Sequence, residues 1–260
     1  MDSITKSVIA LACIFGAALL GMFVRKRLPA EYHPSDSKEA ASASRDVVRL
    51  VMGLVVTTVA LALGLLVGSA KTFYDTQNAE MAQLGANFVL LDRMLAQYGP
   101  EANDVRATLR TVLARQIQAR EQLRGTNRVY SDIKSGATMG ASVIDKIHTL
   151  SPKDDDQRFF KQQSLSLEIQ LGQLRWLMYE QNAVPFPSFL LTTLIAWLII
   201  LFGSFGIFAP GNKVVLTGFL ASALAICGAI LLMLQMYHPQ RGLIRVSEEP
   251  LRAAMEQLGR

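Results

Sequence analysis

The stretch from Val47 to Tyr98 constrains this chain most, because it reads as one helix with two different surfaces. From Leu50 to Ala70 it contains no charged residue, and about 20 apolar residues cross a hydrocarbon core about 30 Å thick. No proline lies between Lys71 and Tyr98, and apolar residues recur there at intervals of three and four: Met81, Leu84, Phe88, Leu91, Leu95 and Tyr98. The pattern predicts a membrane-spanning helix that continues as an amphipathic helix outside the bilayer.

Three further segments lack charge and reach spanning length: Ser7 to Val24, Phe186 to Phe208, and Val214 to Tyr237. The first resembles a secretory signal, but the basic triplet 25–27 follows it directly, where a signal needs small residues. That triplet is typical of a retained anchor. A turn at 209–213 joins the last two segments as a hairpin. The sequence therefore predicts an all-α protein with four transmembrane helices that lie in a lipid bilayer.

The region between the second and third spans predicts a long helical extramembrane domain. Gly99 and Pro100 end one helix and begin the next. Ser151 and Pro152 begin a long helix, and the aspartates 154–156 complement the positive end of its dipole. This helix has an apolar seam of its own, which predicts antiparallel packing against the seam at 81–98: Phe160, Ser164, Leu167, Leu171, Leu174 and Met178.

These patterns divide the chain into four parts. Residues 1–70 hold two spans and a polar loop from Leu28 to Asp46, and residues 71–184 form the helical domain. Residues 185–237 form the span hairpin, and residues 238–260 form an amphipathic tail on the membrane surface or on the helical domain. With four spans, both termini and the helical domain share one side of the membrane. Basic residues are too evenly divided for the positive-inside rule to assign that side.

One face of the second span consists of small side chains. They recur every three or four residues and form a strip along the helix: Gly53, Thr57, Ala60, Gly64 and Gly68. Such a strip lines a pore, or it allows ordinary close packing between spans. The threonine does not decide between these alternatives, because a hydroxyl in a helix also bonds to its own backbone.

A second strip consists of arginines on the helix after Pro100: Arg106, Arg110, Arg120 and Arg124. It is either a solvated face or a surface for lipid phosphates and other anions. The net charge of +5 suits anionic headgroups. Nucleic acid is not expected as a partner, because the arginines lack interleaved aromatic residues.

The chain carries no motif for catalysis or for a cofactor. Its three histidines are far apart, and Cys13 and Cys227 lie inside spans without a neighbouring cysteine. The aspartates 154–156 lack the alternating ligands and the glycine of a calcium loop. No ionisable residue lies deep in a span, which argues against a proton-coupled pump. The sequence therefore predicts neither an enzyme nor a metal site.

Several motifs together resemble the bacterial bestrophin-like membrane proteins, a family of largely unknown function. The most specific are AKTFYDTQ and LDRMLAQYGPEA, and RWL is a further one. Their motif residues are Lys71, Tyr74, Asp75, Gln77, Asp92, Arg93, Gly99, Pro100, Arg175 and Trp176. With GLIR and PLR near the end, the resemblance extends over nearly the whole chain. True bestrophins, which are distant relatives, are pentameric anion channels. Their second span lines the pore, and their termini and helical domain are cytoplasmic.

The resemblance implies a homo-oligomeric channel for small anions such as chloride in a bacterial inner membrane, with the helical domain and both termini cytoplasmic. The small strip, with Val55 and Val59, would line the pore, and the arginine strip would form an anion vestibule. The second span has no aromatic residue, and the segment 238–242 departs from the family pattern. Gating and ion choice therefore do not carry over. A non-conducting scaffold that docks a partner is the alternative function.

Overall fold

The longest element is α2 (Lys38–Tyr98), an uninterrupted helix of 61 residues. The computed structural model describes residues 3–27, 38–122, 140–183, 188–209, 212–237 and 246–259. The helix begins at Lys38, so the polar loop predicted for Leu28 to Asp46 is wrong from that residue onward; residues 28–37 lie outside the described part. The segment KEAASAS contains no proline and is rich in alanine, lysine and glutamate, which favour helix.

The chain forms two units, and α2 contributes to both. The first, the membrane unit, consists of Met1–Thr72 and Phe186–His238. The second, the helical unit, consists of Phe73–Pro185 and Pro239–Arg260. The helical unit thus includes most of the segment predicted as the amphipathic tail.

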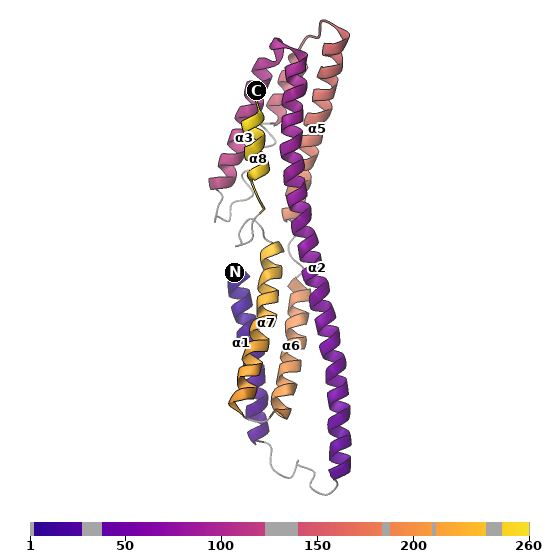
Figure 1. Ribbon diagram of the computed structural model, residues 1–260, viewed down its shortest axis with the longest axis vertical. Coiled ribbons are helices and arrows are strands. Elements are labelled where there is room, and N and C mark those ends of the chain that lie inside the picture. The colour runs from indigo at the N-terminus through magenta and orange to yellow at the C-terminus, as the bar shows by residue number, and fades with distance from the viewer. Residues whose placement is uncertain are drawn as a thin grey trace. The chain divides into compact units, whose positions relative to one another are not determined.

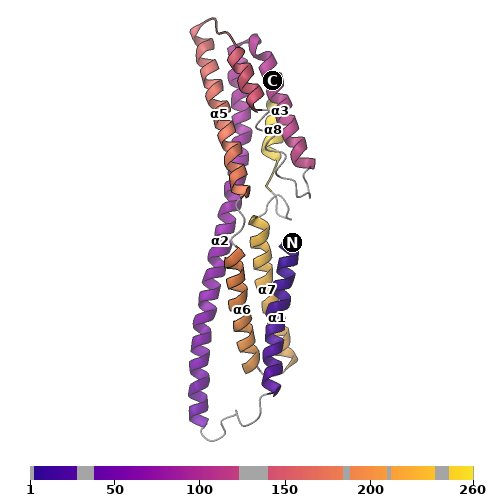
Figure 2. The same ribbon diagram turned by 180° about the vertical axis from the view of Figure 1, so that it is seen from behind.

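The membrane unit contains α1 (Ser3–Arg27), α6 (Ser188–Phe208), α7 (Lys213–Tyr237) and the first half of α2. All four helices are long and apolar enough to cross a membrane, and the described residues include no strand. The predicted all-α fold with four candidate spans is thereby confirmed. Helix α1 lies beside α6 and α7 in both views (Figures 1 and 2).

Helices α1 and α6 approach each other through glycine. A Cβ atom on Gly206 would collide with the carbonyl oxygen of Ala18 and lie 3.1 Å from the Cα of Gly21. A Cβ atom on Gly21 would in turn collide with the carbonyl oxygen of Gly203. Backbone atoms do not move aside as a flexible side chain does, so both glycines are required for this helix contact.

We expect Gly206→Ala to destabilise the membrane unit by about 1–3 kcal/mol, the usual cost of overpacking. The added methyl group collides with backbone atoms of α1. Gly218→Ala on α7 is the matched control, because its Cβ meets open space. Alanine favours helix over glycine by about 1 kcal/mol, so this control should be neutral or slightly stabilising. Thermal unfolding in detergent measures both, and equal midpoints for the two variants would contradict the contact.

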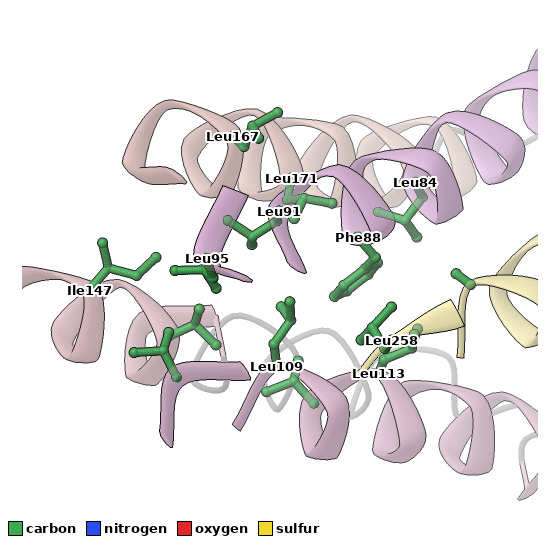
Figure 3. Close-up of a cluster of buried hydrophobic side chains, with 14 of the residues drawn as sticks. Leu84, Phe88, Leu91, Leu95, Leu109, Leu113, Ile147, Leu167, Leu171 and Leu258 are labelled. Atoms are coloured by element: carbon green, nitrogen blue, oxygen red, sulfur yellow. The ribbon is translucent and has the colours of Figure 1, made fainter. Parts of the chain in front are cut away.

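In the helical unit, the second half of α2 packs antiparallel to α5 (Asp155–Ala183). Hydrogen bonds at both ends of the pair fix the direction. Gln157 Nε2 donates to the carbonyl of Tyr98 at 3.0 Å, and Gln77 Nε2 donates to Gln181 Oε1 at 2.9 Å. Figure 3 shows Leu91 of α2 beside Leu171 of α5, and both belong to the same buried core. The predicted antiparallel pairing is confirmed.

The other elements of the helical unit are η2 (Pro100–Ala102), α3 (Asn103–Gln122), the helical residues 140–149, and α8 (Glu249–Gln257). Every residue of the predicted α2 seam is buried, and so is the α5 seam apart from the half-buried Phe160. Helix α3 adds Leu109 and Leu113 to the same core, α8 adds Leu251, and Leu258 follows directly after α8. The two seams therefore belong to one hydrophobic core, which α3 and the α8 segment complete (Figure 3).

Of the two helix starts predicted in the helical unit, the structure confirms the one at Pro100 and shifts the one at Ser151. Gly99 has φ of 121°, a conformation that glycine adopts readily, and Pro100 begins the next element, as predicted. Helix α5 begins at Asp155 rather than at Ser151, because Asp154 Oδ1 caps it by accepting a hydrogen bond from the amide of Gln157 at 2.6 Å. Among the described residues, no acidic or thiol cluster is arranged to hold a metal ion.

Candidate functional site

The membrane half of α2 is the most exposed of the four candidate spans. In the most apolar 18-residue stretch of each span, 6% of the residues are buried within the subunit in α2, against 33% in α1, 33% in α6 and 17% in α7. The small strip is exposed along its whole length: Gly53, Thr57, Ala60, Gly64 and Gly68. A Cβ atom on any of its three glycines would meet no other atom within 4 Å. One subunit therefore leaves this face uncovered.

The two valines predicted beside the strip lie on another face of the helix. Val59 is buried, and Val55 is half-buried against the core that α1, α6 and α7 share. At 100° per residue, both point away from Gly53 and Gly64. Leu63 and Leu66 pack on the same core. The structure thus separates the predicted pore-lining set into an exposed small strip and an apolar face that packs within the subunit.

The exposed strip presents no hydrogen-bond donor. Thr57 Oγ1 donates to the carbonyl of Gly53 at 2.8 Å, and Thr58 Oγ1 donates to that of Leu54 at 3.0 Å. Thr72 does the same with Gly68 at 3.1 Å. Their hydrogens are thus directed to the helix backbone, as the sequence allowed. A path along this strip would be uncharged and weakly polar.

The described arginines of the predicted strip differ in their exposure and in their partners. Arg106 is half-buried and binds Asp92 through two hydrogen bonds of 2.8 Å, from Nε and Nη2. Arg110 is exposed, Arg120 is half-buried, and Arg124 lies outside the described residues. Arg106 is thus bound by a carboxylate in the same subunit, whereas Arg110 remains at the surface of α3.

Asp92 joins three elements of the helical unit. Besides the two bonds from Arg106, its Oδ2 accepts a hydrogen bond from the amide of Gly259 at 3.1 Å. Its side chain is 6% exposed. Burial raises the pKa of Asp92, but the hydrogen bonds from Arg106 and Gly259 outweigh it, so the pKa is lowered overall. The carboxylate therefore fastens the end of the α8 segment to α2 and α3.

A second buried ion pair lies within α5. Arg175 Nη2 donates to Glu168 Oε1 at 3.0 Å, and the guanidinium lies 5.7 Å from the centre of the Phe88 ring. The side chain of Glu168 is 1% exposed, and its burial raises the pKa of this carboxyl. Gly140 allows the chain to pass over the pair, because a Cβ there would lie 2.5 Å from Arg175 Nη1.

A third polar cluster joins α2 and α5 through side-chain amides. Gln181 accepts a hydrogen bond from Gln77 and donates through Nε2 to Glu80 Oε1 at 2.7 Å. Gln77 and Glu80 are both buried. This relay specifies the register of the two helices, because a shift by one residue would leave buried polar groups without partners.

Half of the ten motif residues of the resemblance have a clear role in the helical unit. Gln77, Asp92 and Arg175 each bind a partner on its helices, and Gly99 and Pro100 form its first turn. The remaining motif residues are at the surface or half-buried on α2 and α5: Lys71, Tyr74, Asp75, Arg93 and Trp176. The assigned half of the motif residues thus stabilises the fold of the helical unit.

Comparison with known families assigns the chain. The family model described as Bestrophin-like domain matches residues 12–251 of the 260-residue chain. The chain belongs to the Bestrophin-like family. No curated protein and no solved structure matches this bestrophin-like chain. The family model and the four apolar helices together identify a membrane protein of the bestrophin-like family.

Sequence reasoning missed the partners of the buried charges. Asp92 and Arg106 are each seven residues from Gly99, and positions equidistant from a tight helix–helix turn face each other. That symmetry was a readable signal. Glu168 and Arg175 are likewise seven residues apart on one helix, so they lie on the same side of α5. Glu80 and Gln181 gave no such signal, because their contact depends on how two distant segments align.

Proposed function

We propose that this bestrophin-like protein assembles as a homo-oligomer in which the α2 helices surround a path for small anions such as chloride. The observation that carries the proposal is the uncovered small face of α2. This helix is the least buried candidate span, and its exposed strip is free of charge. One helix cannot enclose a path, so several copies are needed.

The composition of the strip suits the wall of a narrow path. Gly53, Ala60 and Gly64 carry almost no side chain, so neighbouring α2 helices can approach closely. The hydroxyl hydrogen of Thr57 is bonded to the backbone, so permeating ions would meet oxygen lone pairs and methyl groups. A path with such a wall would conduct ions while it is filled with water, without binding them, and it would close when the water leaves.

Selection for anions is assigned to the arginines at the surface of the helical unit. Arg110 is exposed on α3, and its positive charge raises the local concentration of chloride. Arg106 takes no direct part, because Asp92 neutralises it. We propose the bacterial inner membrane as the location, with the helical unit and both termini in the cytoplasm, as in true bestrophins.

Chloride efflux from liposomes containing the purified protein tests this function. We expect efflux from the unmodified protein and at least a tenfold loss in Gly64→Leu, which corresponds to about 1.4 kcal/mol of added barrier. The leucine side chain would fill the proposed path, because the position is open in the subunit. Gly218→Leu is the control, since that glycine is also open but lies on α7.

The outcomes separate the two functional classes. Equal efflux from Gly64→Leu and Gly218→Leu would place the path elsewhere than on α2. Absence of efflux from intact oligomers would favour a non-conducting scaffold. A purified mass equal to one subunit in detergent would contradict any path built from one α2 per copy.

A further inference from the structure

The outer face of α5 carries no charge over most of its length. Between Gln162 and Tyr179 the only charged residues are Glu168 and Arg175. These two pair with each other, and their side chains are only 1% and 14% exposed. A helix face in contact with water usually carries charged residues, whereas the centre of a protein interface is depleted of them. This face therefore has the composition of a covered surface.

The exposed residues on this face also follow a regular spacing. Those at intervals of three and four form a second seam, opposite the buried one, which we name the outer seam: Phe159, Gln162, Ser166, Ile169, Gln173 and Trp176. Phe159, Ile169 and Trp176 are each more than half exposed. The Trp176 ring packs on Tyr179 at 5.4 Å, which holds it at the surface. This spacing is the pattern by which two parallel helices pack along each other.

We propose that the outer seam of α5 packs against the outer seam of a second copy of this chain. The proposal rests on the homo-oligomer of the proposed function and adds the surface through which copies meet outside the membrane. The α5 helices of neighbouring copies would run parallel around the axis of that oligomer, with Ile169 of each copy close to Ile169 of the next and Trp176 close to its counterpart.

Chain connectivity favours the parallel arrangement. Helix α5 ends at Ala183 and the candidate span α6 begins at Ser188, so α5 is followed closely along the chain by a span. Copies in one membrane therefore extend α5 from the same side, and identical residues meet at the same height. Along the outer seam these are apolar, amide or hydroxyl side chains, so no like charges oppose each other between Gln162 and Tyr179.

The remaining details of the face fit a copy better than a lipid surface. A Cβ atom on Gly172 would meet open space, so the backbones of two copies can approach there. Gln162 and Gln173 bear amides that pair with identical amides, and polar residues in a seam specify its register. Helices that lie on anionic lipid carry lysine and arginine beside their apolar face, and this seam has none between Gln162 and Tyr179.

Disulfide cross-linking of the full chain in membranes tests the contact. Cys13 and Cys227 are first replaced by alanine, since they are the only cysteines. Ile169→Cys should then convert from monomer to covalent dimer on mild oxidation, and so should Trp176→Cys. Gln170→Cys is the matched control, because it is exposed and adjacent in sequence but about 100° away around the helix. It should remain monomeric.

A charge variant provides an independent measurement. Ile169→Glu should reduce the mass of the detergent-solubilised assembly, and Gln170→Glu should leave that mass unchanged. The proposal is overturned if Ile169→Cys cross-links no more than Gln170→Cys, or if Ile169→Glu retains the parent mass. Chloride efflux without the Ile169→Cys cross-link would reject this interface but retain the channel. Cross-linking without efflux would reject the channel and retain the interface.

Discussion

Replacing Arg175 with methionine is expected to destabilise the helical unit by about 3–5 kcal/mol, because it leaves one member of a buried ion pair without its partner. Glu168 is almost inaccessible to water, and its hydrogen bond from Arg175 is 3.0 Å long. Methionine preserves an unbranched apolar side chain near the Phe88 ring. The loss should therefore report the missing charge rather than a cavity.

Urea unfolding followed by circular dichroism, with the spans held in detergent, measures this loss. Arg158→Met is the matched control on the same helix, because Arg158 and its partner Asp155 are both well exposed. Surface pairs contribute about 0–1 kcal/mol, so the control should change little. The double variant Glu168→Leu/Arg175→Met should regain most of the stability. A large loss in that double variant would show that packing, not charge, is responsible.

The stability loss caused by Arg175→Met should depend on pH in a direction that the pKa of Glu168 predicts. Burial raises the folded-state pKa of Glu168 above its ordinary value near 4.5. A carboxyl whose folded pKa is raised favours folding when it is protonated, and this contribution is lost as the pH rises through the folded pKa. Without Arg175 the pKa rises further. The deficit of the variant should thus be largest at neutral pH and should shrink as the pH falls towards 4.5.

Replacing Asp92 with alanine should cost about 3 kcal/mol and loosen α8, because hydrogen bonds to charged groups contribute about 1.5–3 kcal/mol. The change removes the acceptor of Arg106 and of the Gly259 amide. Proteolysis within α8 should accelerate relative to the parent. Asp104→Ala is the control, since Asp104 is 76% exposed in its pair with Lys146 and should contribute little.

The pH dependence of Asp92 runs in the opposite direction to that of Glu168. The folded-state pKa of Asp92 is lowered, so its contribution is present above the ordinary pKa near 3.8 and is lost as the pH falls below it. The parent should therefore lose the α8 attachment in strong acid, and Asp92→Ala should lose that transition. Equal acid sensitivity of α8 in both proteins would contradict this assignment.

The buried seams of α2 and α5 were predictable because burial along a helix imposes a periodic pattern on local sequence. All six seam residues of α2 are buried in the core that periodicity predicted. The start of α2 at Lys38 was missed because polar residues with good helix propensity resemble a loop when no apolar period is present.

The division of the second span into two faces could not be predicted from the sequence. Val59 packs inside the subunit while Leu61 is exposed, yet both are apolar residues in an apolar segment. Lipid tails are as apolar as the interior of a helix bundle, so lipid-facing and protein-facing positions of a span carry the same kinds of side chain. The sequence of a span therefore lacks the periodic alternation that marks the buried face of a helix in water. The same limit explains why the outer seam of α5 required the structure. Only the burial of Glu168 and Arg175 shows that its exposed face is without charge.

The helical unit is assembled from two stretches of chain that the α6–α7 hairpin separates. Leu251 of α8 and Leu258 directly after it are synthesised only after both of those helices. During translation the earlier part of the unit must therefore wait for α8, which approaches α2 so closely that a Cβ on Gly85 would lie 2.7 Å from the carbonyl oxygen of Pro250. A chain that is interrupted inside the hairpin would leave that side of α2 uncovered.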